Sequence, residues 1–308
     1  MKLRRLREDE WDDIAELIYH STNEWYERNL NHGIFTGPPS VARLFPEVYE
    51  ALDPGHCIVM EDEASGRLVG SCFFHPRDTH VSLGIMNVHA DCGGKGVARK
   101  ILAEILRLAD EAGKPVRLVS SAMNLDSFSL YTRAGFVPRA AFQDMMLTVP
   151  EDGLPGELLP ASERVREATP ADVPAMAALE WEIAHIRREG DYAHFLENAA
   201  GIWHASVIDS EQGDRIEGFL CSVNHPGSNL LGPGIMRDAE SALALIRAEL
   251  NHHAGRSPVF LVPVDQPALV QAMYALGAKN CELHFCQVRG EFSPFEGVVM
   301  PTFMPETG

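Results

Sequence analysis

The sequence lacks the features of a membrane or secreted protein. No segment approaches the roughly 20 consecutive apolar residues that a helix needs to cross a bilayer, and the first ten residues are charged, unlike a signal peptide. We therefore expect a cytoplasmic protein with no membrane partner. The six cysteines form no Cys-x-x-Cys pair and no zinc-ligand spacing, so we predict reduced thiols and no bound metal.

Positive charge is also scarce. The chain has 26 Lys and Arg against 44 Asp and Glu, a formal net charge of −18. A nucleic-acid backbone would be repelled except at a local basic patch, so we expect no nucleic-acid partner. An acidic surface could attract a cationic amine, although solubility explains acidity equally well. The length of 308 residues, with 45% hydrophobic and 23% charged residues, predicts an ordinary globular protein of two domains.

Three glycines close together are the most informative feature of the chain. Gly93, Gly94 and Gly96 follow the apolar, β-branched run Val81–Val88, which predicts a strand. Apolar residues recur at helical spacing from Val97 onward, which predicts an amphipathic helix. The glycines therefore stand at a helix N-terminus, where free amides and the helix dipole attract anions and the absence of Cβ lets a phosphate approach the main chain.

Two common phosphate-binding motifs do not fit this segment. A P-loop would need Lys and then Ser or Thr after its last glycine, but Val97 follows Gly96. A dinucleotide fingerprint would need a third glycine where Arg99 stands, and no acidic residue for a ribose follows the next predicted strand, Val116–Ser121. A glycine turn without a ligand stays open as an alternative.

The segment resembles motif A of the GNAT acyltransferase superfamily, V-x-P-x-x-R/Q-G-x-G-x-G/A. Val88 takes the strand-end position, Gly96 a required glycine position and Ala98 the Gly/Ala position. Two positions depart from the motif. Ala90 replaces the proline, and Gly93 lacks the Arg or Gln side chain that family members place near the pyrophosphate.

A second segment, residues 124–136, is similar to motif B of the same superfamily, N-x-x-A-x-x-L-Y-x-x-x-G-F. The spacing matches throughout, and only Ser127 replaces a motif residue, the alanine. Gly135 suits the left-handed stop of a short helix, and Phe136 begins the next strand. Tyr131 is either a half-buried core residue of this helix or, by the resemblance, a catalytic one.

The resemblance implies an acyl-CoA site between two splayed strands. Backbone groups near Met86, Asn87 and Val88 would pair with pantetheine. Asn124 would contact the cofactor, and Tyr131 would be the general acid that protonates the departing thiolate. The phosphate-binding residues implied by motif A are Gly93, Gly94, Lys95, Gly96, Val97, Ala98 and Arg99.

The general base is not identified by the sequence. His80, His89, Glu24 and Glu27 are candidates, but a solvated or structural role fits each of them, and a base that acts through water would leave no sequence signal.

The chain also shows an internal repeat. A segment rich in Pro, Gly and acidic residues, 149–163, separates two similar openings, Arg5-Leu6-Arg7-Glu8 and Arg164-Val165-Arg166-Glu167. We therefore predict two GNAT-like α/β (α+β) domains, each a mixed, largely antiparallel sheet flanked by helices: a catalytic domain at 1–148 and a degenerate domain at 164–308. Convergent use of common strand and helix openings remains an alternative.

The C-terminal copy has lost the motif residues. It has no Gly-x-Gly at its helix start, and Met273 stands at the position of Tyr131. Together these features predict a tandem GNAT-type N-acetyltransferase that uses acetyl-CoA, or another short acyl-CoA, and an amine-bearing small molecule or peptide. The alternative is a non-catalytic acyl-CoA sensor or scaffold. The sequence does not indicate the acceptor or the oligomeric state.

Overall fold

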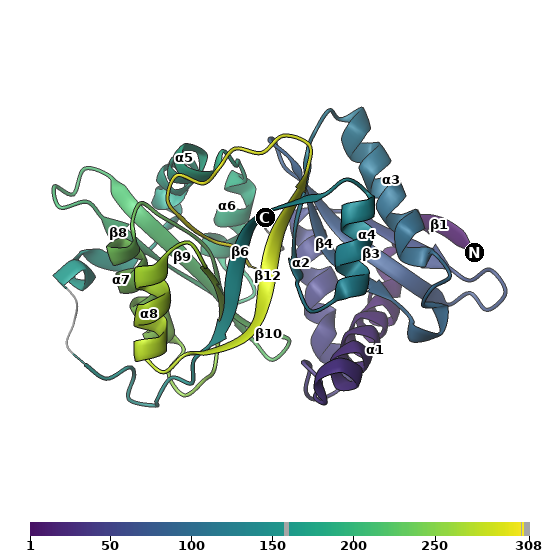
Figure 1. Cartoon of the computed structure of the whole chain (residues 1–308), viewed down its shortest axis with the longest axis horizontal. Coiled ribbons are helices and arrows are strands. Elements are labelled where there is room, and N and C mark those ends of the chain that lie inside the picture. Colours follow the sequence, from purple (N-terminus) through teal and green to yellow (C-terminus); the bar gives the residue numbers. More distant parts are fainter. Residues whose placement is uncertain (157–159, 303, 305–308) are drawn as a thin grey trace. The chain divides into compact units, whose positions relative to one another are not determined.

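The computed structural model describes residues 1–156, 160–302 and 304. They form two compact units, here called the first unit, Met1–Arg117, and the second unit, Leu118–Gly308. Each unit is a twisted, largely antiparallel sheet with helices packed on it (Figure 1). The predicted fold class is confirmed.

The first unit places five strands in the order β1-β2-β3-β4-β5. All neighbours are antiparallel except β4 and β5, which run parallel. Its elements are β1 (Lys2–Arg5), α1 (Trp11–Leu30), α2 (Leu44–Leu52), β2 (Cys57–Glu61), β3 (Leu68–Pro76), β4 (Val81–Val88), α3 (Val97–Glu111) and the start of β5 (Val116–Ser121).

Helices α1 and α3 cover opposite faces of this sheet. Neighbouring residues of a strand point to opposite faces, so one contacts α3 and the next points towards α1. On β3, Gly70 lies under α3: a Cβ there would stand 2.4 Å from the Val97 side chain. The next residue, Ser71, is opposite Asn87 of β4, whose amide donates to Ser21 of α1 at 2.8 Å. The missing side chain at Gly70 thus lets the first turn of α3 pack closely against the sheet.

The second unit places its strands in the order β5-β12-β6-β11-β10-β9-β8-β7, with β13 paired to β10. It contains the end of β5, α4 (Leu125–Arg133), β6 (Val137–Met146), β7 (Val165–Glu167), α5 (Val173–Ala184), α6 (Glu189–Glu197), β8 (Trp203–Asp209), β9 (Ile216–His225), β10 (Ser228–Met236), α7 (Ala239–His252), β11 (Val259–Pro263), α8 (Pro267–Ala275), β12 (Lys279–Arg289) and β13 (Val298–Met300).

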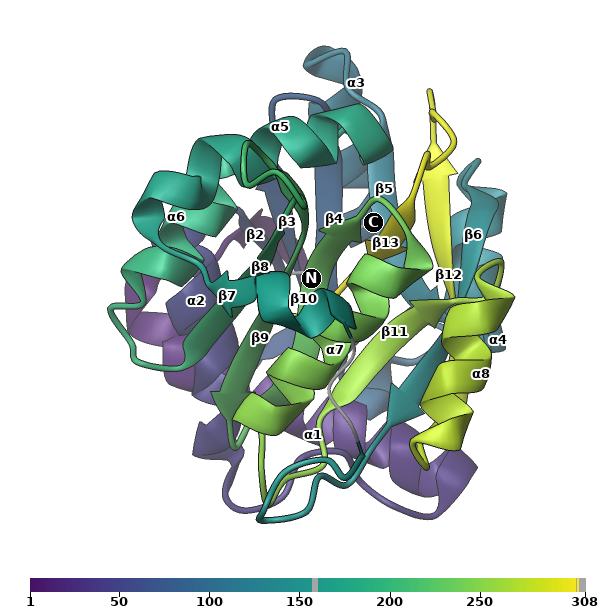
Figure 2. The same cartoon turned by 90° about the vertical axis from the view of Figure 1, so that its left-hand side faces the viewer.

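The sheet of the second unit is also covered on both faces (Figure 2). On β9, Phe219 stacks edge-to-face on Tyr192 of α6 at 4.9 Å, whereas Ser222 donates to Glu249 of α7 at 2.6 Å. These two strand residues are three positions apart and therefore point to opposite faces. Glu249 is fully buried but accepts further bonds from Ser206 and His204, so its burial is compensated.

Strand β6, which precedes the predicted linker, pairs with two strands of the C-terminal half. Phe142 of β6 is opposite His284 of β12 on one edge and Pro263 of β11 on the other. Because of this pairing, the compact units divide after Arg117 and not at the linker. The domain boundaries 1–148, 149–163 and 164–308 stay a prediction from the sequence repeat, and residues 157–159 of the linker lie outside the described residues.

No helix among the described residues has the length and apolar character needed to span a bilayer.

Candidate functional site

Strand β4 ends beside an open edge of its sheet. Its parallel ladder with β5 consists of two pairs, Val81 with Val116 and Ser82 with Arg117. On its other edge β4 stays paired with β3 as far as Val88, with an irregularity between the Cys72 and Phe74 positions of β3. Within the first unit, the second half of β4 therefore offers main-chain groups on one edge. Met86, Asn87 and Val88, predicted to pair with pantetheine, all lie in this part of the strand.

The glycine loop follows β4 directly. A short 3-10 turn at Ala90–Cys92 is closed by a bond from the Gly93 amide to the Ala90 carbonyl, at 3.0 Å. Gly94 and Gly96 then adopt positive φ angles of 71° and 76°. Residues with a Cβ rarely adopt this left-handed conformation, so these two positions require glycine for the chain to turn into α3.

The N-terminus of α3 is free of side-chain capping. Gly96 is its N-cap, with no side-chain cap bond, and the first helical bond runs from the Lys100 amide to the Gly96 carbonyl, at 3.2 Å. The amides of Val97, Ala98 and Arg99 precede that bond and therefore have no acceptor within the helix. Together with the positive end of the helix dipole, they form an anion site of the predicted kind.

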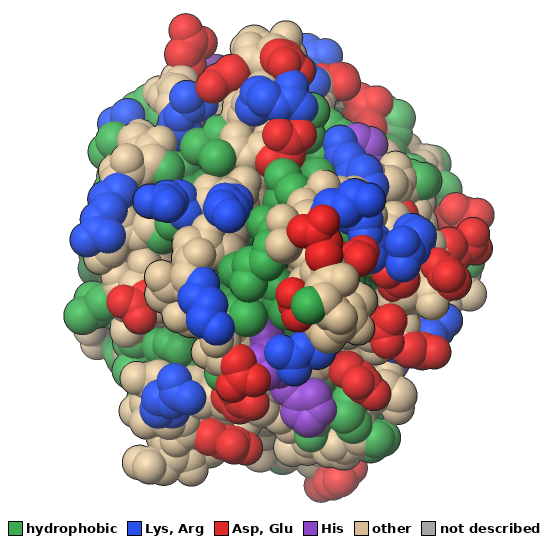
Figure 3. Space-filling view, turned by 90° about the vertical axis from the view of Figure 1, so that its right-hand side faces the viewer, with side chains coloured by type: hydrophobic (Ala, Val, Ile, Leu, Met, Phe, Trp, Pro, Cys, Tyr) green, Lys and Arg blue, Asp and Glu red, His purple; other side chains and the backbone are tan. Residues whose placement is uncertain are grey.

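The charges around the loop favour an anion although the whole chain is acidic. The side chains of Lys95, Arg99 and Lys100 are all exposed, and Asp91 is the acidic residue of the loop. Asp91 lies 3.9 Å from a nitrogen of Arg67, which offsets part of its charge. Figure 3 shows one face of the molecule, on which Lys and Arg side chains gather at several places among acidic ones.

The four candidate bases lie in different surroundings. His89 stabilises the loop, since its Nδ1 accepts from the Asp91 amide at 3.2 Å. His80 is buried in the turn before β4, where Thr79 bonds its Nδ1 at 3.0 Å. Glu24 and Glu27 are exposed on α1. Both histidines therefore have local structural roles, and no contact distinguishes either glutamate as a base.

Motif B lies in the second unit and has the predicted local structure. Asn124 caps α4, with its Oδ1 accepting from the Ser127 amide at 3.0 Å. Tyr131 is 7% exposed and packs against Phe136, with ring centroids 5.8 Å apart. Gly135 has φ of 91°, as the predicted helix stop requires. The roles of Asn124 towards a cofactor and of Tyr131 as an acid stay predictions.

The sequence analysis missed a buried polar cluster beside motif B, formed by Ser121, Asp144, Glu282 and His284. The hydroxyl of Ser121 donates to Glu282 at 2.5 Å, and Glu282 is opposite Asp144 in the β12–β6 ladder. His284 Nδ1 lies 3.6 Å from Asp144. The available sequence signal was the alternation of Glu282 and His284 with apolar residues in a strand-like run.

Burial moves the pKa values in this cluster strongly. Desolvation, reinforced by the nearby Glu282, raises the pKa of Asp144 to about 8, and desolvation lowers the pKa of His284 to about 4. Both groups are therefore mainly neutral near pH 7, so their 3.6 Å contact is not an ion pair there.

At the corresponding positions of the second unit, the helix N-terminus is capped and the strand edge is paired. The helix after β10, α7, is capped by the carboxylate of Asp238, which accepts from the Ser241 amide at 2.8 Å and would repel a phosphate. The edge of β10 is paired with β13, with Ile235 opposite Val299. Residues Val298–Met300 of the C-terminal tail thus form part of the sheet.

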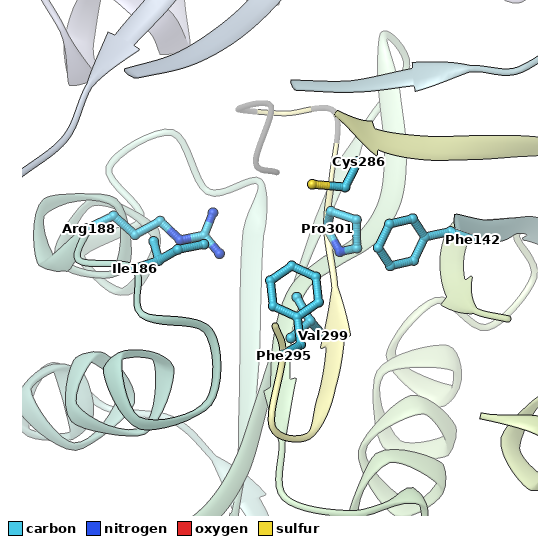
Figure 4. Close-up of a pocket in the computed structure, with 7 residues that line it drawn as sticks. All are labelled: Phe142, Ile186, Arg188, Cys286, Phe295, Val299 and Pro301. Atoms are coloured by element: carbon cyan, nitrogen blue, oxygen red, sulfur yellow. The ribbon is translucent and has the colours of Figure 1, made fainter. Parts of the chain in front are cut away.

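A small pocket remains beside β13 (Figure 4), lined by Phe142, Ile186, Arg188, Cys286, Phe295, Val299 and Pro301. The guanidinium of Arg188 is bonded to Glu180 at 2.6 and 2.8 Å. The charge at this pocket is therefore already paired within the chain.

Among the described residues, no group of three or more His, Cys, Asp or Glu side chains could hold a metal ion.

Comparison with known proteins agrees with the motifs. Residues 15–136 match the Acetyltransferase (GNAT) family, and this range includes both motifs in full. Members of this family transfer acyl groups from acyl-CoA. A comparison with curated protein sequences finds no relative of the chain.

Solved structures share the fold along nearly the whole chain. A protein from Pyrococcus horikoshii assigned as an acetyltransferase has a TM-score of 0.72 at 14% identity, covering 97% of this chain and 91% of its own. A GCN5-related N-acetyltransferase from Sphaerobacter thermophilus has a TM-score of 0.65 at 14% identity, covering 96% and 98%. A tandem GNAT protein from the clavulanic acid biosynthesis pathway has a TM-score of 0.61 at 16% identity, covering 95% and 99%. These likenesses show that the fold is shared along nearly the whole chain, and the division into two GNAT-like domains stays a prediction from the sequence repeat.

Proposed function

We propose that this protein is an N-acetyltransferase that moves an acetyl group from acetyl-CoA to a primary amine. The observation that supports this most directly is the uncapped N-terminus of α3 beside the open edge of β4. Both features belong to the first unit, and the second unit has lost both. We therefore expect each chain to bind one acetyl-CoA.

The main chain supplies most of the proposed binding. The amides of Gly94 and of Gly96 to Arg99 hold the pyrophosphate, whereas the Lys95 amide donates to the Cys92 carbonyl at 3.2 Å. The exposed side chains of Lys95 and Arg99 add positive charge. Gly93 contributes no side chain, so binding depends on the amides more than it would with Arg or Gln there. The main chain of Met86, Asn87 and Val88 pairs with pantetheine as an added strand would.

The proposed chemistry is a direct attack on the thioester. The neutral amine nitrogen forms a bond to the carbonyl carbon and loses one proton to water. The carbon–sulfur bond breaks, and the electron pair of that bond goes to sulfur. Tyr131 gives its phenolic proton to the thiolate, since an acid placed near developing negative charge lowers the barrier. A backbone N–H of β4 polarises the carbonyl oxygen.

Two measurements test the proposal. Calorimetric titration with acetyl-CoA tests binding, and release of free CoA thiol across a panel of primary amines tests transfer. Binding with amine-dependent thiol release supports the enzyme. Binding without release for any amine favours the non-catalytic acyl-CoA sensor, for which the absent side chain at Gly93 is the motivating observation, and no binding contradicts both.

A further inference from the structure

Two buried oxygen atoms lie beside each other on the sheet of the first unit and have no hydrogen-bond partner. They belong to Ser71 of β3 and Asn87 of β4, which are opposite each other in the antiparallel ladder. In the described part of the chain, neither the Ser71 hydroxyl nor the side-chain oxygen of Asn87, Oδ1, makes a hydrogen bond. Ser71 is fully buried and Asn87 is 6% exposed. Since buried polar atoms nearly always have a partner, we expect a polar molecule to bind here.

The contacts of Asn87 determine what kind of partner its oxygen needs. Its Nδ2 donates to Ser21 at 2.8 Å and to Thr22 at 3.1 Å, both on α1. The Ser21 hydroxyl donates to the Leu17 carbonyl at 2.6 Å, so towards Asn87 it is an acceptor. Both hydrogens of Nδ2 are thereby used, and the orientation of the amide is fixed. Oδ1 can only accept a hydrogen bond, so its partner must be a donor.

The two oxygen atoms lie on the face of the sheet that α3 does not cover. Gly70 and Val88, the neighbouring pair of the ladder, face α3, whose Val97 side chain fills the space over Gly70. Neighbouring strand residues point to opposite faces, so Ser71 and Asn87 point towards α1. A donor therefore meets Oδ1 on the α1 face.

Asn87 also lies in the part of β4 that the proposed function uses. Its main chain is among those that would pair with pantetheine, along the edge of β4 that is open within the first unit. An added strand lies in the plane of the sheet, so either face gives access to a thioester at its end. Val97 packs on the α3 face, whereas the α1 face presents an unpartnered hydrogen-bond acceptor. We therefore expect the amine to approach on the α1 face.

We propose that Asn87 binds the acceptor amine through its side-chain oxygen. One N–H of the amine donates to Oδ1, and this bond turns the nitrogen lone pair towards the thioester carbonyl. The main chain of the same residue holds the pantetheine, so Asn87 aligns the two substrates with each other. This assignment rests on the proposed function.

The test uses the full chain with acetyl-CoA and the primary amine of the panel that gives the highest turnover. Asn87→Leu keeps a side chain of similar size and removes the oxygen. We expect KM for the amine to rise about tenfold, the loss expected for one hydrogen bond, and acetyl-CoA affinity to stay within twofold because the main chain is unchanged. The matched control is Asn29→Leu, the same change at an exposed position of α1, which should alter neither value.

A second variant separates binding of the amine from a structural role of Asn87. Ser21→Ala removes one of the two bonds that hold Nδ2 but keeps Oδ1, so KM for the amine should change less than threefold. An equal rise of KM in Ser21→Ala and Asn87→Leu would show that Asn87 only holds α1 on the sheet, and would overturn the assignment.

A third variant is used if Asn87→Leu does not fold. Asn87→Asp loses the Nδ2 donor but keeps an oxygen that accepts from the amine, so KM for the amine should not rise. A tenfold rise in this variant would show that the bonds to α1 matter and the oxygen does not, which would also overturn the assignment.

The failure of each proposal has its own result. If the wild-type chain transfers acetyl to no amine, the proposed function fails, and the assignment of Asn87 fails with it. If the wild type transfers acetyl but folded Asn87→Leu keeps KM for the amine within threefold, Oδ1 binds a structural water, and only the assignment of Asn87 is wrong.

Discussion

Asp144 makes the stability of the protein depend on pH in a predictable direction. The residue is 7% exposed, and burial together with the charge of Glu282 raises the pKa of its carboxyl group from an ordinary value near 3.8 to about 8. In the unfolded chain the group has its ordinary pKa. Between these two values the folded state holds a proton that the unfolded state has lost, so the stability that this proton provides is complete below about pH 4 and disappears as pH rises through 8.

The size of the effect follows from the two pKa values. Between pH 6.5 and 8 the contribution of Asp144 should fall by about 1.5 kcal/mol. Replacement of Asp144 by Asn keeps the shape and the neutral state and removes the titration. The stability of the variant, measured relative to the wild type, should therefore rise by about 1.5 kcal/mol over this interval, which corresponds to roughly 3–6 °C in Tm.

Differential scanning calorimetry of both proteins at pH 6.5, 7, 7.5 and 8 measures this difference. The other titrating groups, His284 among them, cancel in the comparison except where they touch Asp144. A difference in Tm between variant and wild type that stays constant within 1 °C from pH 6.5 to 8 would show that Asp144 is already ionised in the folded protein, and the description of the buried cluster would be wrong.

Three further variants test other parts of the structure. Gly70→Ala should destabilise the first unit by about 1–3 kcal/mol and weaken acetyl-CoA binding, because the new Cβ would stand 2.4 Å from the Val97 side chain. The control Gly190→Ala, at a position with open space around it, should have neither effect. Thermal unfolding measures the stability of each variant, and calorimetric titration measures its affinity for acetyl-CoA. Tyr131→Phe should lower kcat about 100-fold at nearly unchanged acetyl-CoA affinity, and near-normal turnover on a good acceptor would return Tyr131 to a packing role. Asp238→Ala should cost about 1 kcal/mol of stability through loss of the α7 cap without creating a second acetyl-CoA site; a titration that shows two sites in this variant contradicts the account of the second unit.

Local patterns predicted the part of the fold around the glycine loop. Val81–Val88 and Val116–Ser121 form the strands expected, and α3 starts at Val97, because alternation, helical periodicity and glycine at positive φ are all properties of short segments. The spacing of motif B likewise placed Gly135 at the end of a helix.

Long-range pairing could not be predicted in the same way. The sequence contains no local signal that β6 inserts between β11 and β12, or that β13 covers β10, because these contacts join segments that are far apart in the chain. The buried polar cluster depends on that pairing, because the register of β12 places Glu282 opposite Asp144 and within reach of the Ser121 hydroxyl. The candidate bases chosen from neighbouring sequence, such as His89, proved to have local structural roles.

The central claim is that one uncapped helix N-terminus, at Gly96, binds acetyl-CoA. The most direct test is calorimetric titration of acetyl-CoA into the wild type, Gly96→Val and Gly113→Val. Gly113 is the matched control, since it has φ of 64° and lies just beyond the other end of α3, so valine is strained there too but far from the loop. We predict one site per chain in the wild type and in Gly113→Val, and no measurable binding in folded Gly96→Val. Two sites in the wild type, or unchanged affinity in Gly96→Val, would contradict the claim.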